Sequence, residues 1–313
     1  MRELRFWAMG CQMAVLLEAE GPAAQTVLEA VPEWFATWEN VLSRFRADSE
    51  LTKLNQHSGH WTQVSDVLAE VLRVALEMAE SSGGLVTPTI LTALEAAGYT
   101  HPYEIMQRAG ADLATPSVEG GSAAPAPDWR AIRIEGNWVA LPAGVRVDLG
   151  GVAKGWAAEQ VANQLAEFGP CLVDAGGDIV VRGPRRDGEP WVIGVMDPMA
   201  RDQDLALLAL EQGAVATSGR DYRRWLRSGR HFHHLIDPRT GRPAETDVLT
   251  ATAFAPTGPE AEMAAKVMLL LGSDQGLSWI EQRPRYAGLV VLEHGEPRVR
   301  FSSRMHPLLL APA

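Results

Sequence analysis

The stretch Val147-Asp148-Leu149-Gly150-Gly151-Val152-Ala153-Lys154-Gly155 is the densest cluster of glycine and charge in the chain. It lies between an apolar segment, 145–149, and a helix that the sequence predicts over 156–168. Glycines at such a junction let backbone N–H groups and a helix N-terminus approach an anion, and a lysine adds a point charge for phosphate. The pattern matches neither GxGxxG nor the P-loop. From the pattern alone, an anion-binding corner and a glycine-rich turn carrying a surface lysine are equally good interpretations.

A second glycine corner follows one predicted helix later. In Val173-Asp174-Ala175-Gly176-Gly177-Asp178, a strand again enters paired glycines. Taken singly, this pattern is typical of an ordinary hairpin with aspartate at the turn. Two such loops about a helix apart could also line one cleft.

A third cluster is His231-Phe232-His233-His234-Leu235-Ile236-Asp237, which runs on into a rigid turn over 238–243. Three histidines within four residues suggest zinc, but this spacing does not place them on one helix face and no cysteine is nearby. The prolines hold Asp237 at a fixed angle just before the turn, as a binding loop requires.

The fourth cluster places Glu262 and Lys266 four residues apart on a helix predicted over 259–271. This is the favourable orientation for a helical ion pair, worth about 0.2–0.5 kcal/mol. From the residues alone, a solvated salt bridge is the simplest interpretation.

The remaining pattern predicts an α+β fold. We expect a strand over 6–18, a helix over 23–43 weakened by Pro32, and a helix capped by Ser65. Strands and helices then mix without strict alternation. Composition divides the chain into a helix-rich part with the first strand (1–109), a flexible linker or loop (110–128) and an α+β part (129–313), together forming one compact structural unit.

Composition excludes several classes of protein. The 313 residues carry a net charge of −11, and an acidic surface disfavours nucleic acid as a partner. Two cysteines, Cys11 and Cys171, exclude a disulfide scaffold and a cysteine-rich metal site. No apolar run approaches the roughly 18 residues that a membrane span needs, so no membrane is expected as a partner and a cytoplasmic location is predicted.

Seven motifs, taken together, resemble those of the ApbE family, the FAD:protein FMN transferases. The resemblance covers nearly the whole chain, and seven matches in sequence order make chance a poor explanation. The matching segments are Met9-Gly10, with Cys11 for the threonine of MGT; 43–50 with Asn55, for SxYxxxSExxxLN; 83–89, for GGAFDPT; 148–155, for DLGGIAKG; 174–178, for NxGGD; 217–219, for TSG; and 234–243, for HIIDPxTGxP.

The resemblance implies an ApbE/T-fold-like, two-part α+β architecture with an FAD cleft between the halves. It implies FAD with Mg²⁺ on its pyrophosphate, and transfer of FMN to a threonine of an acceptor flavoprotein with release of AMP; some members hydrolyse FAD instead. His234 and Asp237 would lie near the reacting phosphate, with His234 handling the proton. By position, the FAD site would be lined by Met9, Phe45, Leu85, Val86, Thr87, Asp148, Lys154 and Ile236.

The chain departs from the family pattern at two places. Val86-Thr87 stands where the family has Phe-Asp, which removes a carboxylate assigned to the flavin. Glu262 and Lys266 stand where the family's ADxxxT supplies aspartate and threonine as metal ligands, beside a backbone carbonyl near Gly151. An ammonium has no acceptor and cannot ligate Mg²⁺.

Two hypotheses follow for the metal. In one, the Lys266 ammonium replaces Mg²⁺, pairs with the pyrophosphate and leaves an FAD-binding protein with little or no transferase activity. In the other, Lys266 points away and Mg²⁺ is held by Glu262, the Gly151 carbonyl, water and phosphate oxygens. Two further alternatives are a non-catalytic scaffold protein and a redox flavoenzyme, and the absence of GxGxxG disfavours only Rossmann-type members of the latter class.

Overall fold

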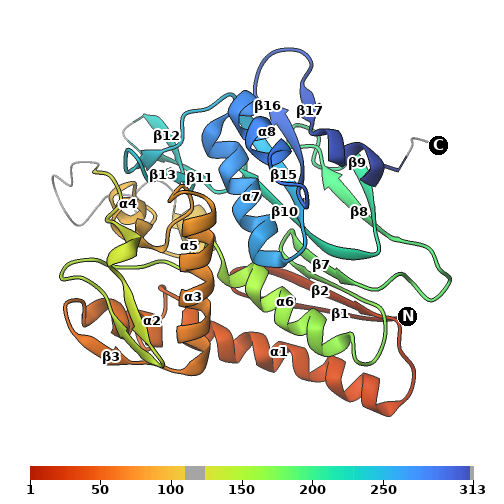
Figure 1. Ribbon diagram of the computed structural model, residues 1–313, viewed down its shortest axis with the longest axis horizontal. Coiled ribbons are helices and arrows are strands. Elements are labelled where there is room, and N and C mark those ends of the chain that lie inside the picture. Colours follow the sequence, from red (N-terminus) through yellow and green to blue (C-terminus); the bar gives the residue numbers. More distant parts are fainter. Residues whose placement is uncertain (110–123, 228, 311–313) are drawn as a thin grey trace. The chain divides into compact units, whose positions relative to one another are not determined.

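The computed structural model describes residues 1–109, 124–227 and 229–310, and it divides into two compact units (Figure 1). Unit 1 comprises Met1–Phe35, Lys154–Asp221 and Thr246–Ala313, and unit 2 comprises Ala36–Ala153 and Tyr222–Glu245. Residues 110–123 of the predicted linker lie outside the described residues, and 124–128 have no regular structure. The three-part division predicted from composition stays a prediction.

Unit 1 is built on one eight-stranded sheet in which every neighbouring pair is antiparallel. This sheet, with helices packed on it, confirms the predicted α+β class. In sheet order the strands are β1 (Arg2–Ala8), β2 (Cys11–Leu17), β6 (Cys171–Ala175), β7 (Asp178–Arg182), β10 (Gln212–Gly219), β15 (Val248–Ala255), β16 (Ala287–Leu292) and β17 (Val299–Phe301).

Helices cover one face of this sheet and a hairpin covers the other. Cys171 turns its Sγ toward the Ala162 carbonyl of α6, whereas its neighbour Leu172 packs with Trp191 of the hairpin, because successive strand residues face opposite sides. Figure 1 shows α6 and α7 in front of the strands. The covering elements are α6 (Ala153–Leu165), α7 (Gly258–Leu271), α8 (Ser273–Glu281), the hairpin β8 (Trp191–Met196) and β9 (Asp204–Leu210), and a 3-10 helix at Ser303–Leu308.

Unit 2 combines short helices with small sheets. Its core packs α4, α5 and β11 around Tyr99, Tyr103 and Trp225. The elements are α2 (Glu50–Gln56), α3 (Asp66–Ser81), α4 (Leu91–Ala96), α5 (Tyr103–Ala109), a sheet of β3 (Trp61–Gln63), β5 (Trp138–Ala140) and β4 (Arg133–Glu135), the pairs β11 (Arg224–Arg227) with β12 (Arg230–His233) and β13 (Ile236–Asp237) with β14 (Arg242–Pro243), and 3-10 helices at Pro88–Ile90 and Trp129–Ala131.

Two local predictions are corrected, and a third is confirmed. The single strand expected over 6–18 is a hairpin, because the chain reverses at Met9-Gly10 with φ of 49° and 70°. Helix α6 begins at Ala153 and ends at Leu165, three residues before the predicted bounds. The helix predicted over 23–43 is confirmed by α1 (Pro22–Leu42), which runs through Pro32 because its buried face offsets the lost hydrogen bond. The division between the units falls within this helix.

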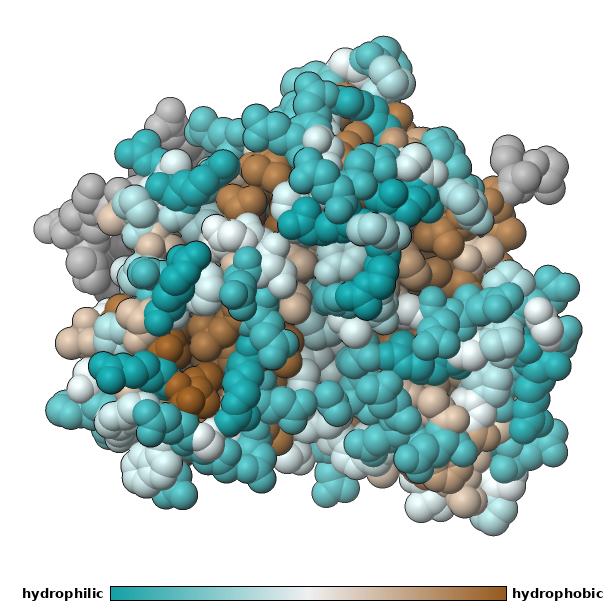
Figure 2. Space-filling model, in the orientation of Figure 1, coloured by the Kyte–Doolittle hydropathy of each residue, from teal (hydrophilic) through white to brown (hydrophobic). Residues whose placement is uncertain are grey.

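The described helices include none that is both long enough and apolar enough to cross a bilayer. Figure 2 shows that the faces in view are covered mainly by hydrophilic residues, with apolar side chains exposed only in patches.

The prediction of a capped helix is confirmed by α3, where the Leu68 N–H donates to Ser65 Oγ at 3.3 Å.

Candidate functional site

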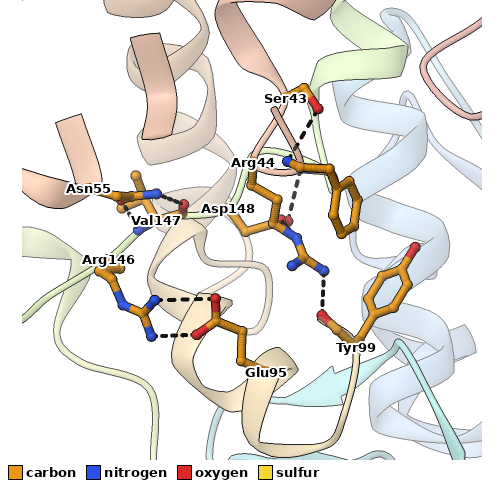
Figure 3. Close-up of polar contacts among 10 residues, drawn as sticks. Ser43, Arg44, Asn55, Glu95, Tyr99, Arg146, Val147 and Asp148 are labelled. Carbon is orange, nitrogen blue, oxygen red and sulfur yellow. Dashed lines mark hydrogen bonds and ion pairs between the residues drawn. The ribbon is translucent and has the colours of Figure 1, made fainter. Parts of the chain in front are cut away.

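The glycine corner at Asp148 is held by buried hydrogen bonds within unit 2. The side-chain amide of Asn55 brackets Val147: its Nδ2 donates to the Val147 carbonyl at 2.9 Å, and its Oδ1 accepts the Val147 N–H at 2.7 Å (Figure 3). The Asp148 N–H donates to the Pro88 carbonyl at 2.8 Å, and Asp148 Oδ1 accepts the Gly150 N–H at 2.9 Å. The corner is therefore a fixed turn that leads directly into α6.

Arg44 is the cation that completes this corner. Its Nε lies 2.7 Å from Asp148 Oδ2, and its terminal nitrogen donates to the Tyr99 carbonyl at 2.8 Å (Figure 3). The guanidinium carbon lies 4.0 Å from the centre of the Phe45 ring and 4.8 Å from that of Tyr99. Because the side chain is only 6% exposed, Arg44 ties three separate segments together in a dry environment.

The sequence of the segment 43–50 does not by itself assign a role to Arg44. The one signal in the sequence is a basic residue between Ser43 and Phe45, at a position that the motif leaves unspecified. The partners of Arg44 lie far along the chain, so no local pattern could identify them.

An aromatic cluster brings Phe45 and His234 to one tyrosine. The Phe45 ring, 37% exposed, meets Tyr99 edge-on at 5.7 Å, and Tyr99 stacks on Trp225 at 5.5 Å with an interplanar angle of 21°. The His234 ring lies 6.3 Å from Tyr99. Burial raises the pKa of Tyr99, against the lowering effect of Arg223 and Arg44, so its phenol stays protonated at neutral pH. The structure thus joins two residues that the sequence placed in the FAD site and at the reacting phosphate.

The turn after His234 is fastened by Asp237. Both Asp237 oxygens accept hydrogen bonds from Arg239, at 2.9 Å to Nε and 2.7 Å to the terminal nitrogen, and the Gly241 N–H donates to the Asp237 carbonyl at 2.8 Å. Gly241 has a φ of 66°, which glycine adopts without strain. Ile236 is buried in the core of unit 2. Asp237 therefore holds the turn through its hydrogen bonds, and Ile236 anchors the start of the turn in the core of unit 2.

Residues 85–87 precede the short helix Pro88–Ile90 in the same unit. Leu85, Val86 and Thr87 are all half-buried. The Val86 N–H donates to Ser82 Oγ at 3.0 Å, and Thr87 caps the helix by accepting the Thr89 N–H at 3.3 Å. Thr87, where the family has aspartate, therefore offers a hydroxyl and no charge.

Four charged residues gather inside unit 1, and we refer to them as the four-charge cluster: Lys154, Asp178, Glu262 and Lys266. Lys154 at the start of α6 pairs with Asp178 of β7. Glu262 Oε1 accepts a hydrogen bond from Lys266 Nζ at 2.9 Å, and Oε2 accepts the Gly155 N–H at 3.2 Å. As whole residues, Asp178 is 3% exposed and Glu262 is 2% exposed, so the solvated salt bridge expected from the sequence is wrong.

Burial and neighbouring charges oppose one another in this cluster. Burial raises the pKa of Asp178 to about 6, against the lowering effect of Lys154, and Glu262 adds to the rise. Burial alone would also raise the pKa of Glu262, but Lys266 and Lys154 hold it below its ordinary value. Glu262 is therefore the carboxylate that keeps its charge, and it keeps it through the two ammonium groups.

Met9 forms the turn between β1 and β2 of unit 1. Its φ of 49° is the one left-handed value among the described residues other than glycine. A methionine held in this region is strained, and such strain is concentrated at functional sites. The two-residue turn Met9-Gly10 has the backbone signs of a type I′ hairpin, whose twist matches the strands it joins.

The fit of a magnesium ion fails at Glu262. Magnesium binds oxygen ligands in near-octahedral geometry, whereas both Glu262 oxygens already accept hydrogen bonds, one of them from a cation. Within residues 1–109, 124–227 and 229–310, no group of three or more His, Cys, Asp or Glu side chains is placed to hold a metal. Gly151, the other predicted ligand, belongs to unit 2. We therefore derive no step through a metal.

Fold and clusters together define an antiparallel α+β protein whose charged and aromatic side chains gather at glycine turns. A family model described as "ApbE family" matches residues 9–290, and the chain belongs to that family. It is 30% identical to a FAD:protein FMN transferase of Treponema pallidum over 94% of this chain and 84% of that protein. A FAD:protein FMN transferase of Vibrio cholerae is 31% identical over 77% of this chain and 72% of that protein.

A solved structure supports the same assignment. The crystal structure of the ApbE protein from Thermotoga maritima superposes with a TM-score of 0.82 at 28% identity, covering 99% of each chain. The family resemblance and the ApbE-type mixed architecture predicted from the motifs are thereby confirmed.

Proposed function

We propose that this chain is a flavin transferase that takes FAD as substrate, passes FMN to a threonine hydroxyl of an acceptor flavoprotein and releases AMP. The observation that carries the proposal is the 30% identity, over 94% of the chain, to a protein named FAD:protein FMN transferase. The family match over residues 9–290 supports it, because it spans every motif cluster in the chain.

The reaction requires one bond to form and one to break at the FMN phosphorus. The threonine oxygen attacks this phosphorus, the bond to the AMP phosphate oxygen breaks, and AMP leaves with the electron pair. The hydroxyl proton passes to a base. Positioning and neutralisation of phosphate charge supply most of the rate in phosphoryl transfer. In this chain Lys154 and Lys266 provide positive charge, and the exposed Phe45 ring provides a surface on which an aromatic ring system stacks.

We assign the proton to His234, because imidazole is the side chain that most often serves as a general base in enzymes. Its contact with Tyr99, which also meets Phe45, supports a place beside the flavin half of the substrate. Asp237 acts as a positioning residue for the turn, because both of its carboxylate oxygens accept hydrogen bonds from Arg239. The Asp148 carboxylate likewise pairs with Arg44 and accepts the Gly150 N–H, and so it fixes the corner that precedes Lys154.

A second candidate function is an FAD-binding protein with little transferase activity. The observation that favours it is the hydrogen bond between Lys266 and Glu262, which puts an ammonium where the family pattern places a metal ligand. Magnesium dependence forms no part of the main proposal. Three points stay predictions. They are the cytoplasmic location, the cleft between the halves, and the contacts that FAD would make with Met9, Leu85, Val86, Thr87 and Ile236.

The test is a transfer assay with FAD and an acceptor domain that a characterised family member modifies. Transfer is read as flavin fluorescence retained by the denatured acceptor, with AMP measured by chromatography. We expect His234→Ala to bind FAD but to lose transfer by about 100-fold, the typical contribution of a general base. His294→Ala, at an exposed histidine, is the matched control.

Three other outcomes contradict the proposal in different ways. Binding of FAD that stays intact favours the second candidate. FMN and AMP in equal amounts without labelled acceptor indicate hydrolysis. No binding of FAD at about 1 mM, a free energy weaker than about −4 kcal/mol, favours a scaffold protein.

A further inference from the structure

The sequence leaves open whether Lys266 turns toward or away from Glu262, and the structure turns it toward. The Nζ–Oε1 distance is 2.9 Å, and only 16% of the lysine side chain is exposed. We propose that Lys266 is a built-in cation: its ammonium replaces a divalent metal ion at Glu262, so this chain binds its nucleotide without one. The part that concerns FAD rests on the proposed function, and the part that concerns the metal does not.

The first support is the burial of the helix that carries the pair. Nearly every residue of α7 is buried, and the Glu262 side chain is 3% exposed. A surface pair of the same spacing would be hydrated and exchangeable, whereas removing Lys266 here leaves a carboxylate charge with little water around it. The lysine is therefore a fixed part of the site.

The second support is the use of both Glu262 oxygens. Oε1 accepts from Lys266 and Oε2 from the Gly155 N–H, at the point where α6 and α7 approach so closely that a Cβ on Gly155 would lie 2.8 Å from the Gly258 backbone. A metal ion could bind Glu262 only by displacing an ammonium or a backbone donor held by this close contact.

The third support is charge balance. Lys154 and Lys266 together neutralise Asp178 and Glu262, so the four-charge cluster has a net charge of zero. A divalent ion placed there would meet two ammonium groups in a poorly hydrated environment. An incoming phosphate, in contrast, meets two cations on the partly exposed side of the cluster, since each lysine side chain is 16% exposed.

The fourth support is the rarity of lysine in the sequence. The sequence contains lysine only at positions 53, 154 and 266, and every other basic side chain apart from histidine is arginine. Two of these lysines lie in the four-charge cluster. An ammonium is a compact point charge, closer in size to a metal ion than the planar guanidinium is, so lysine fits where a small cation is needed.

The experiment compares the wild-type protein with Lys266→Thr, and uses Lys53→Thr, at an exposed position of α2, as the matched control. Mn²⁺ binding is followed by electron paramagnetic resonance, with and without FAD. FAD affinity is measured by fluorescence quenching in excess EDTA and in millimolar MgCl₂. We expect the wild type and Lys53→Thr to bind no Mn²⁺ at Glu262 and to bind FAD equally, within about twofold, in both media.

Lys266→Thr should gain one Mn²⁺ site, and its FAD affinity should fall about tenfold in EDTA and recover in MgCl₂. The inference is overturned if wild-type protein binds Mn²⁺ in a way that Glu262→Gln abolishes, or if MgCl₂ raises its FAD affinity about tenfold or more. Circular dichroism reports whether Lys266→Thr folds. If it does not, the wild-type and Glu262→Gln measurements decide alone.

Failure of the proposed function gives a different result. If FAD binds in neither medium, the flavin transferase proposal fails, and the Mn²⁺ comparison without FAD still decides whether Lys266 excludes a metal from Glu262.

Discussion

Two buried ion pairs, one in each unit, differ in the cation they use. In unit 2 the Arg44 guanidinium lies against the Phe45 and Tyr99 rings and pairs with Asp148 (Figure 3). In unit 1 the Lys266 ammonium pairs with Glu262, one helical turn away. Arginine forms several directed contacts at once and so fixes the geometry of three segments, whereas lysine places a compact charge beside one carboxylate. The difference separates a pair that fixes a turn of unit 2 from a pair that places a compact positive charge inside unit 1.

The first prediction tests the structural pair. Arg44→Ala should lower the free energy of unfolding by about 3–5 kcal/mol, because it leaves the Asp148 carboxylate, whose side chain is 11% exposed, without its cation and removes packing against two rings. Urea denaturation measures the loss. Arg146→Ala is the matched control, since Arg146 also pairs with a carboxylate, Glu95, but both side chains are about a third exposed. Its loss should be below about 1 kcal/mol, and equal losses in the two variants would contradict the comparison.

The second prediction tests the charge-supplying pair. Glu262→Gln should cost about 3 kcal/mol, because Lys266 loses its carboxylate while it stays mostly buried. In the double variant Glu262→Gln/Lys266→Gln, the cost should be about 1–3 kcal/mol smaller than the sum of the two single costs. The same cycle at the exposed pair Arg186–Glu20 should give a coupling below about 0.5 kcal/mol. Additive costs at Glu262 and Lys266 would show that the pair is solvated after all.

Much of the fold could be predicted because its signals are local. The Ser65 cap, the apolar period of α3 and the strand-entering glycines at 176–177 each depend on neighbours within a few residues. The hairpin at Met9-Gly10 could not, since methionine rarely adopts positive φ and nothing in its side chain signals a turn.

The site was predictable only in part, for a related reason. Spacing placed Glu262 and Lys266 on one side of a helix, but it could not tell whether that side faces water or the sheet. Their burial depends on the packing of α7 against β10 and β15. β15 directly precedes α7, but β10 lies much earlier in the chain, so no local pattern shows that the three elements meet. Arg44 escaped assignment because its partners Tyr99 and Asp148 come together only in the folded unit.

The third prediction extends the comparison to pH. Burial raises the pKa of Asp178 to about 6 from 3.8, so the folded state binds a proton more tightly than the unfolded state does. The contribution of Asp178 to stability is therefore fully present below about pH 4 and is lost as pH rises through about 6. Asp197, whose carboxylate accepts the Met199 N–H, has a lowered pKa and behaves in the opposite way: its contribution is lost as pH falls.

Carbon-13 titration of the aspartate carboxylates, assigned through Asp178→Asn and Asp197→Asn, measures both groups. A midpoint for Asp178 near 6 and one for Asp197 below its ordinary value are expected. A midpoint of Asp178 below 3.8 would show that Lys154 outweighs burial, and the four-charge cluster would then be better hydrated than the structure indicates.

The fourth prediction has the smallest effect on stability and separates folding from binding. Phe45→Leu should cost less than about 1 kcal/mol, because the ring is 37% exposed, it meets Tyr99 only edge-on, and a cation over an exposed ring contributes about 0.5–1 kcal/mol. Under the proposed function the same change should weaken FAD binding about tenfold, since leucine offers no ring for stacking. Fluorescence quenching gives the affinity, and thermal unfolding gives the stability.

Trp61→Leu is the matched control, because Trp61 is similarly exposed, at 42%, but lies on β3 of the small sheet in the same unit. It should leave FAD affinity unchanged. An equal loss in both variants would mean that FAD affinity follows general stability. No loss in Phe45→Leu would remove Phe45 from the flavin site, and Arg44 would then serve the Asp148 corner alone, because the ring it supports would have no ligand to meet.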